Sequence, residues 1–167
     1  MNTENKSNTP VEIKDLWQTP IEIFKSLDLE FDFTCDVASS KENTLCSVHI
    51  DEEQNALAID EWSSSNWCNP PYSNIGPWVD KAIEQHSLGN TTVMLVPSDT
   101  SVKWFKNAFM SCSEVRFITG RISFINAGTG KAVSGNNKGS VLLIWRGFSP
   151  KGSKSVSLID RGELKLY

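Results

Sequence analysis

The sequence predicts an α/β fold, with a mostly parallel sheet covered by helices on both faces and closed by a C-terminal β-hairpin. Strand-like and helix-like segments alternate through most of the chain, which is typical of such sheets. Residues Thr91–Pro97 form a continuous apolar run bounded by turn residues, as expected for a strand buried on both faces. Three further strands, at Val115–Ile118, Ile122–Ile125 and 139–145, supply the closing hairpin.

The bulk composition fits one domain. The chain has 167 residues, of which 39% are hydrophobic and 22% charged, enough for a sizeable core. Residues 1–12 are polar and predict a flexible N-terminal tail, which leaves residues 13–167 as a single domain. The net charge of −4 excludes a global basic field for nucleic acid, although a local basic patch is sufficient for phosphate contacts.

The first ordered elements are a short helix and a strand. Thr19 matches an N-cap and Pro20 a first-turn proline, so a helix is expected over about residues 20–28. Residues 31–38 are β-prone and run into a tight turn. A helical turn at 40–46, a strand at 47–50 and a strand at 66–68 follow.

The second half predicts two helices and a long loop. Ser73 or Asn74 can cap a helix that ends at Gly89, and Ser98-Asp99 can start another that carries Trp104. Residues 126–138 are rich in Gly, Asn and Lys and show no periodicity, which is typical of a functional or mobile loop. A final edge strand is expected after Pro150.

The segment Asn69-Pro70-Pro71-Tyr72 is the strongest functional signal. Each proline fixes its own φ and pushes the preceding residue toward extended geometry, so the Pro70 carbonyl can point away from the sheet. The side-chain oxygen of Asn69 and this carbonyl make a pair of acceptors, and Tyr72 adds a flat face. Together they can hold a planar amino group; the alternative is an ordinary Pro-Pro surface turn.

Other polar residues follow strands on the same predicted edge. Parallel sheets bind ligands at the carboxyl ends of their strands. Asp36, Asp51 and Asn55 all lie there, which suits an adenosine-containing ligand, with Asp51 on ribose hydroxyls and Asn55 on the adenine amine. The alternative for all three is loop capping.

The spacing of the cysteines predicts no metal-binding site, and the hydropathy of the chain predicts no membrane span. Cys35, Cys46, Cys68 and Cys112 form no C-x-x-C pair and are expected to be reduced thiols of a cytoplasmic protein. No apolar run reaches about 18 residues.

Several motifs together resemble the phage and prophage Dam-type DNA N6-adenine methyltransferases. The resemblance covers most of residues 15–146. It rests on the order and spacing of Asp15-x-Trp17-x-Thr19-Pro20, Phe33-x-x-Asp36-x-Ala38, Asn69-Pro70-Pro71-Tyr72, Leu95-x-Pro97, Trp104-Phe105 and Gly120-Arg121-Ile122-Ser123-Phe124.

The resemblance implies a Rossmann-like methyltransferase fold, S-adenosylmethionine as cofactor and double-stranded DNA as partner. It implies methylation of adenine N6, with the base flipped out of the duplex and stacked on Tyr72. The implied catalytic residues are Asn69, Pro70, Pro71 and Tyr72. The implied cofactor-binding residues are Trp17, Thr19, Pro20, Asp36, Ala38, Asp51 and Asn55.

The DNA contacts are less defined. Arg121, Lys131 and Lys138 are the candidates for nucleic-acid binding because of their charge and the loop around them; a solvated surface loop is the alternative. Trp17 and Trp104 are expected to be core or cofactor-pocket walls rather than base-stacking groups. The enzyme's choice of DNA target sequence is expected to come from loops.

Two residue patterns depart from the family, and two other functions stay open. Asn69 stands where many adenine methyltransferases carry Asp, and Ala38-Ser39-Ser40 replaces the usual glycine-rich cofactor turn. A methyltransferase acting on a protein glutamine amide can use the same Asn-Pro-Pro-Tyr segment. A non-catalytic nucleic-acid-binding domain with this fold is the third possibility.

Overall fold

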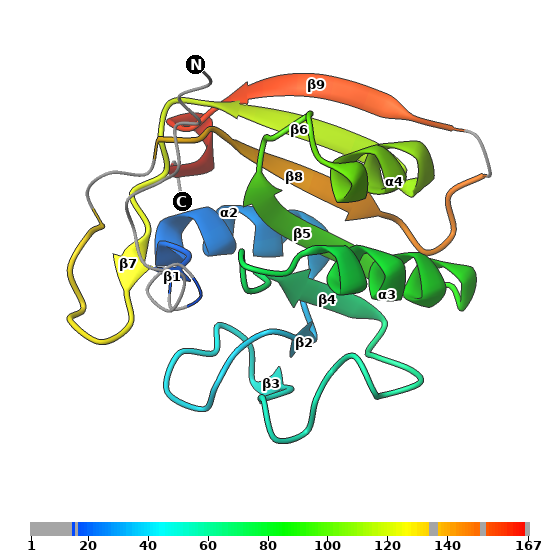
Figure 1. Ribbon diagram of the computed structural model, residues 1–167, viewed down its shortest axis with the longest axis horizontal. Helices are drawn as coiled ribbons and strands as arrows, with labels where there is room; N and C mark the ends of the chain where they lie inside the picture. The colour runs from blue at the N-terminus through cyan, green and yellow to red at the C-terminus, as the bar shows by residue number, and fades with distance from the viewer. Residues whose placement is uncertain (1–14, 16, 134–136, 151–152, 166–167) are drawn as a thin grey trace, which may run out of the picture.

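A seven-stranded sheet forms the centre of the molecule, with helices on both of its faces (Figure 1). The computed structural model describes residues 15, 17–133, 137–150 and 153–165; the expected tail at residues 1–12 lies outside them. The strand order is β3-β2-β4-β5-β8-β6-β9, and β1 and β7 form a separate pair. The strands are β1 (Trp17–Gln18), β2 (Cys35–Asp36), β3 (Val48–His49), β4 (Ser65–Cys68), β5 (Thr91–Pro97), β6 (Glu114–Thr119), β7 (Ile125–Asn126), β8 (Ser140–Trp145) and β9 (Ser155–Asp160).

Parallel pairing dominates the large sheet, as predicted. The pairs β2–β3, β2–β4, β4–β5 and β6–β9 are parallel, and only β8 runs antiparallel to its neighbours β5 and β6. The carboxyl ends of β2, β3, β4, β5 and β6 therefore share one edge. This mixed α/β architecture is compatible with a methyltransferase-like fold.

Two apolar cores lie on opposite faces of the sheet. Alternate side chains of β5 point to opposite faces, so Val93 and Leu95 join one core while Met94 and Val96 join the other. The helix α2 (Ile21–Phe31) covers the first face. The helices α3 (Gly76–Ser87) and α4 (Lys103–Ser111) cover the second.

The first helix differs from its prediction at both ends. Pro20 rather than Thr19 is the N-cap, and its carbonyl accepts hydrogen bonds from the amides of Ile23 and Phe24. The helix runs to Phe31 because this ring is buried in the α2 core, and it stops at Asp32, whose φ is 47°. The strand expected over residues 31–38 is consequently reduced to β2.

The starts of the other two helices also differ. The N-cap of α3 is Ile75, with Pro77 in the first turn, and neither Ser73 nor Asn74 caps it. The helix α4 begins at Lys103 instead of Ser98-Asp99, because the Asp99 carboxylate is held by the Ser101 amide and hydroxyl and by the Lys138 ammonium.

The C-terminal β-hairpin is not confirmed. The strands β6 and β8 are antiparallel neighbours, but residues 120–139 separate them. Instead of a strand at Ile122–Ile125, the short β7 pairs with β1. The expected edge strand after Pro150 is β9, which lies parallel to β6 and is followed by a 3-10 helix, η1 (Glu163–Lys165).

Candidate active site

The Asn-Pro-Pro-Tyr segment follows β4 directly, at the shared carboxyl edge of the sheet. The parallel register pairs Asp36 of β2 with Trp67 of β4, so Asp36 and Asn69 lie on adjacent strand ends. Pro70 is buried, and Asn69, Pro71 and Tyr72 are half-buried. The segment is therefore packed into the edge and is not an exposed surface turn.

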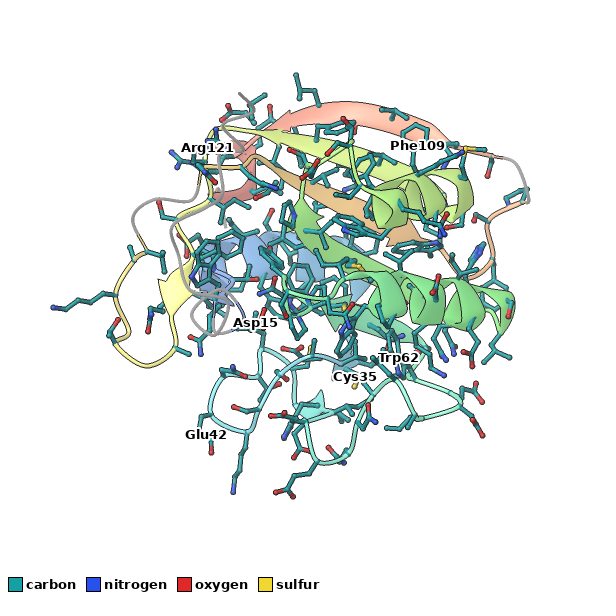
Figure 2. The ribbon with its side chains drawn as sticks, in the orientation of Figure 1. Asp15, Cys35, Glu42, Trp62, Phe109 and Arg121 are labelled. Carbon is teal, nitrogen blue, oxygen red and sulfur yellow. The ribbon has the colours of Figure 1, made fainter. Side chains whose placement is uncertain are left out.

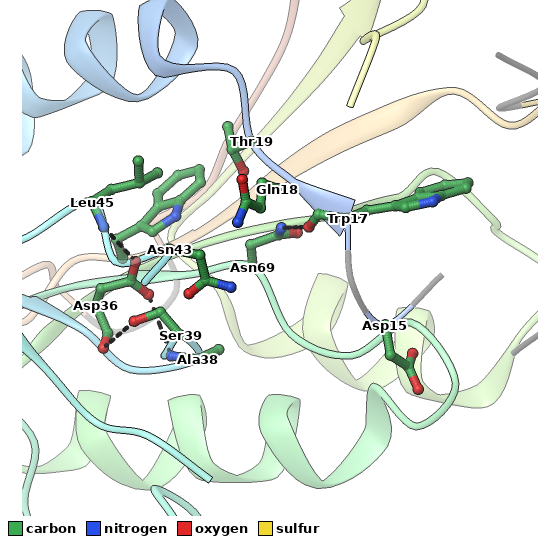
Figure 3. A pocket seen from close by; sticks show the side chains of 11 residues that line it. Asp15, Trp17, Gln18, Thr19, Asp36, Ala38, Ser39, Asn43, Leu45 and Asn69 are labelled. Carbon is green, nitrogen blue, oxygen red and sulfur yellow. Dashed lines mark hydrogen bonds between the residues drawn. The ribbon is translucent and has the colours of Figure 1, made fainter. Parts of the chain in front are cut away.

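The Asn69 amide is held in one orientation by the N-terminal strand β1. Its Nδ2 atom donates a hydrogen bond of 2.8 Å to the carbonyl oxygen of Trp17 (Figure 3). Its Oδ1 atom is buried and has no hydrogen-bond partner among the described residues. A buried acceptor without a partner costs about 1–3 kcal/mol, so this oxygen is suited to a donor that arrives with a ligand.

A second contact fixes the end of the same segment. The Asp15 carboxylate accepts hydrogen bonds from the Ser73 amide, at 3.0 Å, and from the Ser73 hydroxyl, at 2.7 Å. Asp15 and Trp17 thus bind the two ends of the stretch from Asn69 to Ser73. The two contacts join parts of the chain more than fifty residues apart and hold the segment rigidly in place.

The Tyr72 ring is packed more tightly than expected. It contacts Trp17 and Phe124 edge-on, at centroid distances of 6.1 and 5.9 Å, while those two rings stack on each other at 5.5 Å. The Tyr72 hydroxyl donates to the Leu95 carbonyl at 3.3 Å. Burial raises the pKa of this hydroxyl well above its usual value, so it stays protonated.

A small cavity lies between β1, the end of β2 and Asn69. Its volume is about 40 Å³. Figure 3 shows the polar side chains of Asp36, Asn43 and Asn69 gathered around it. Besides Asn69, the lining includes Thr19, whose buried Oγ1 has no hydrogen-bond partner among the described residues. The lining residues are Asp15, Trp17, Gln18, Thr19, Asp36, Ala38, Ser39, Asn43, Leu45, Trp67 and Asn69.

Asp36 anchors the loop that closes the cavity. Its carboxylate accepts hydrogen bonds from the amides of Leu45, at 3.1 Å, and Ala38, at 3.4 Å. Only 3% of the residue is exposed, and this burial raises its pKa above the usual aspartate range, although the two amides act in the opposite direction. The loop from Ala38 to Leu45, which replaces a glycine-rich turn, is therefore built on a buried carboxylate.

The structure places three predicted cofactor residues outside this cavity. Asp51 and Gln54 cap each other, since each side chain accepts a hydrogen bond from the other's amide. Asn55 is exposed with φ of 53°, and Pro20 begins α2. Cofactor roles for Asp51, Asn55 and Pro20 stay predictions.

Sequence reasoning missed several lining residues. The sequence marks Asp15 only as part of a motif, and its contact with Ser73 depends on how distant segments pack. Asn43 and Leu45 carry no local signal, because only the fold of the loop after β2 brings them to the cavity.

The predicted nucleic-acid-binding residues lie away from the cavity. Arg121 and Lys131 are exposed, and the Lys138 ammonium bonds the Asp99 carboxylate at 2.7 Å. Residues 126–133 contain a turn in which the Asn126 side-chain oxygen accepts hydrogen bonds from the amides of Gly128 and Thr129. DNA contacts by Arg121, Lys131 and Lys138 stay a prediction.

Charge changes sign along the carboxyl edge. The loops after β2 and β3 carry Asp36, Glu42, Asp51, Glu52 and Glu53 against the single cation Lys41. The segments at the ends of β5, β8, β6 and β9 carry Lys103, Lys138, Arg121 and Arg161, with Asp99 and Asp160 as their acids. Figure 2 shows Glu42 and Arg121 at opposite ends of this edge, with Asp15 between them.

The described residues add three general findings. They contain no group of three or more His, Cys, Asp or Glu side chains placed to hold a metal ion. None of the helices within them is long and apolar enough to cross a membrane. All four cysteines are buried and free, and burial raises the pKa of Cys35 to about 11 and that of Cys46 to about 12.

A mixed α/β sheet with an Asn-Pro-Pro-Tyr segment at its carboxyl edge is compatible with a methyltransferase-like protein. The family model described as DNA N-6-adenine-methyltransferase (Dam) matches residues 6–166. The chain belongs to this family of adenine-specific DNA methyltransferases.

Two curated relatives carry the same name. The DNA N-6-adenine-methyltransferase of Haemophilus phage HP1 is 40% identical over 164 residues, which cover 96% of this chain and 95% of that protein. The DNA N-6-adenine-methyltransferase of Escherichia phage T1 is 39% identical over 159 residues, which cover 84% of this chain and 66% of that protein. No solved structure matches the chain.

Proposed function

We propose that this chain transfers a methyl group from S-adenosylmethionine to N6 of adenine in DNA, at the Asn69-Pro70-Pro71-Tyr72 segment. The observation that carries the proposal is the buried, unpartnered Oδ1 of Asn69. Its orientation is set by the Trp17 carbonyl, which already accepts from Nδ2. The amide therefore offers the acceptor that an exocyclic amine needs.

The residues of the small cavity fit such a cofactor in their chemistry. When bound, S-adenosylmethionine supplies an electrophilic methyl group on a positively charged sulfonium. The carboxylates of Asp15 and Asp36 and the acceptor oxygens of Asn43 and Thr19 suit a ligand of this charge. The acidic half of the carboxyl edge adds to the favourable field.

The volume of the cavity is smaller than that of a usual ligand pocket. About 40 Å³ compares with about 300–1,000 Å³ in typical sites. Residues 17–19 and 38–45 both contribute to the cavity lining, so we propose that these two segments separate when the cofactor enters. The Asp36 contacts to Leu45 and Ala38, each above 3 Å, are the ones that such an opening would lengthen.

Asn69 and Pro70 then act by position and electrostatics. The lone pair of adenine N6 is delocalised into the ring, which makes the amine a poor nucleophile. Oδ1 of Asn69 and the Pro70 carbonyl would accept its two N–H bonds and favour a tetrahedral nitrogen with a localised lone pair. A neutral amide accomplishes this without the charge of an aspartate.

The base must leave the duplex to reach this segment. Tyr72 supplies a ring held in place by Trp17, Phe124 and the Leu95 carbonyl, and stacking on such a ring contributes about 1–3 kcal/mol. Because both relatives are phage proteins, we propose that the enzyme acts in the cytoplasm of a phage-infected or prophage-carrying bacterium. No feature of the site favours a protein glutamine amide over adenine.

Methyl transfer can be measured directly. Purified protein is incubated with methyl-labelled S-adenosylmethionine and unmethylated duplex DNA, and the DNA is digested to nucleosides. The expected product is labelled N6-methyladenine. Label found only in protein would favour a protein amide substrate, and an absence of all label would favour a non-catalytic domain.

A further inference from the structure

A second, larger cavity lies on the α4 side of Tyr72, and no role has been given to it. Its volume is about 380 Å³. One wall is the segment Tyr72, Ser73 and Asn74, directly after the catalytic prolines, and the other is the first half of α4, with Lys103, Trp104 and Asn107. Tyr72 belongs both to this cavity lining and to the Asn69-Pro70-Pro71-Tyr72 segment, so a ligand bound here would lie near the proposed site of the reacting base.

Trp104 is placed to offer its indole to this cavity. The helix α4 buries Phe105 and Ala108 in the core, which leaves the preceding Trp104 only half-buried, at 5.8 Å from the Phe105 ring. Gly76 of α3 stands opposite, and a Cβ built there would lie 4.0 Å from the Cβ of Trp104. The prediction that Trp104 is a core or cofactor-pocket wall is therefore incomplete, since this residue lines an open cavity.

The polar groups of the cavity suit a nucleotide. Lys103 is exposed and forms none of the ion pairs found among the described residues. The Asn107 amide lies one helical turn further along the same face of α4. An aromatic face stacks on any base, and a lysine binds phosphate as a point charge.

The charge distribution separates this cavity from the cofactor side. Lys103 belongs to the part of the carboxyl edge where Lys138 and Arg121 also lie, whereas the acidic loops lie beyond Asn69. Asp80 also lines the cavity and repels phosphate, so a phosphate group would depend on Lys103, the one cation among the described residues of the lining.

We propose that this cavity binds an unpaired nucleotide of the substrate DNA strand, with Trp104 stacked on its base and Lys103 on its phosphate. The proposal rests on the proposed function and adds a DNA-binding site to it. It also explains how a net acidic chain holds DNA, because the contact is local.

Single-stranded DNA of mixed sequence is a suitable probe, because stacking of this kind tolerates any base. Binding of a fluorescent oligonucleotide is measured by anisotropy over a range of salt concentrations for the wild type and for Lys103→Ala, Trp104→Ala and Trp104→Phe. Trp104→Ala is expected to weaken binding about ten-fold, with partial recovery in Trp104→Phe. Lys103→Ala is expected to lower the log–log salt slope by about 0.7.

Lys106→Ala provides the matched control. Lys106 is exposed on the same helix and carries the same charge, but it does not line the cavity. It should leave DNA affinity and the KM for DNA close to wild type, whereas Lys103→Ala raises KM with little change in kcat. Thermal unfolding checks that the Trp104→Ala variant still folds. If this variant does not fold, the Lys103→Ala variant alone tests the proposal.

The outcomes separate this proposal from the proposed function. A wild type that forms N6-methyladenine, with Lys103 and Trp104 variants that match Lys106→Ala, would overturn the nucleotide site alone. A wild type that neither methylates nor binds DNA would overturn the proposed function and this site with it.

Discussion

The side-chain amide of Asn69 and the carbonyl of Trp17 are joined by a hydrogen bond of 2.8 Å. The bond uses one N–H of the amide and leaves Oδ1 as a buried acceptor without a partner among the described residues. The reverse orientation would set two oxygens against each other. The strand β1 therefore determines which end of Asn69 would meet a substrate in the proposed function.

Asn69→Ala tests the catalytic role of this acceptor. The variant is expected to lower kcat about 100- to 1,000-fold, because a positioned hydrogen-bond partner is lost from the transition state. Binding of S-adenosylmethionine, measured by calorimetry, should change little. Activity close to wild type would mean that the segment is only structural.

Asn69→Asp asks whether the donor end matters as well. The variant keeps an acceptor but places a carboxylate oxygen against the Trp17 carbonyl. It is expected to retain more activity than Asn69→Ala and less than the wild type, despite the aspartate of many related enzymes.

Asp15→Ala tests the second contact of the N-terminal segment. It removes the acceptor for both the amide and the hydroxyl of Ser73. We expect kcat to fall about ten-fold, since a small displacement of a reacting group costs up to about 100-fold. Asp15→Asn keeps one acceptor oxygen and should restore most of the rate; equal loss in both variants would indicate a role for the charge itself.

The burial of Asp36 predicts that cofactor binding depends on pH. Burial raises the pKa of Asp36, so its carboxylate becomes protonated at a higher pH than an exposed aspartate. A cationic cofactor favours the ionised form, and its affinity should therefore rise with pH through the raised pKa and then level off. Calorimetry of S-adenosylmethionine binding across mildly acidic to neutral pH measures this rise, and Asp36→Asn should weaken binding and remove it.

Local patterns predicted the elements better than the contacts between them. The run Thr91–Pro97 is one strand with the expected bounds, because its burial on both faces leaves no other solution. The helix α2 extends beyond its expected end because the Phe31 ring finds a core that no local pattern reveals.

In the candidate site too, local patterns predicted individual residues but did not predict the contacts between distant segments. Asn69, Asp36, Thr19 and Ala38 were predicted from their positions after strands or in motifs, and all line the small cavity. The Asp15–Ser73 and Asn69–Trp17 contacts join residues more than fifty positions apart. Packing of β1 against β7 creates them, and nothing in the spacing of the motifs specifies that pairing.

A charge network at the opposite edge of the sheet predicts acid-sensitive stability. The Arg116 guanidinium donates two bonds of 2.7 Å to Glu30 and one of 2.7 Å to Glu114, and Arg146 contacts both carboxylates. The bonds from Arg116 lower the pKa of Glu30, and those from both arginines lower the pKa of Glu114 against the effect of burial. Their stabilisation is complete above the usual glutamate pKa and is lost as pH falls through the lowered values.

Arg116→Met should cost about 1–2 kcal/mol at neutral pH, since two partly buried carboxylates lose a partner. The difference between variant and wild type should shrink in acid, as measured by urea unfolding at several pH values. Arg116→Lys, which keeps the charge but loses the bidentate geometry, should fall between them. If the difference in unfolding free energy between variant and wild type does not change with pH, the lost stability comes from the packing of Arg116 on the Phe31 ring.

The Asp99 carboxylate restrains Lys138, which is a predicted DNA contact. The hydrogen bond from Lys138 and those from Ser101 lower the pKa of Asp99 to about 2, so the carboxylate stays ionised throughout the working pH range. If Lys138 contacts DNA, phosphate must compete with this carboxylate for the ammonium. Asp99→Asn weakens the competitor and is expected to tighten DNA binding about two- to five-fold, with a steeper salt dependence. Lys138→Ala in the same background should cancel the gain; tighter binding that survives this second change would show that Asp99 acts through its own negative field and not through Lys138.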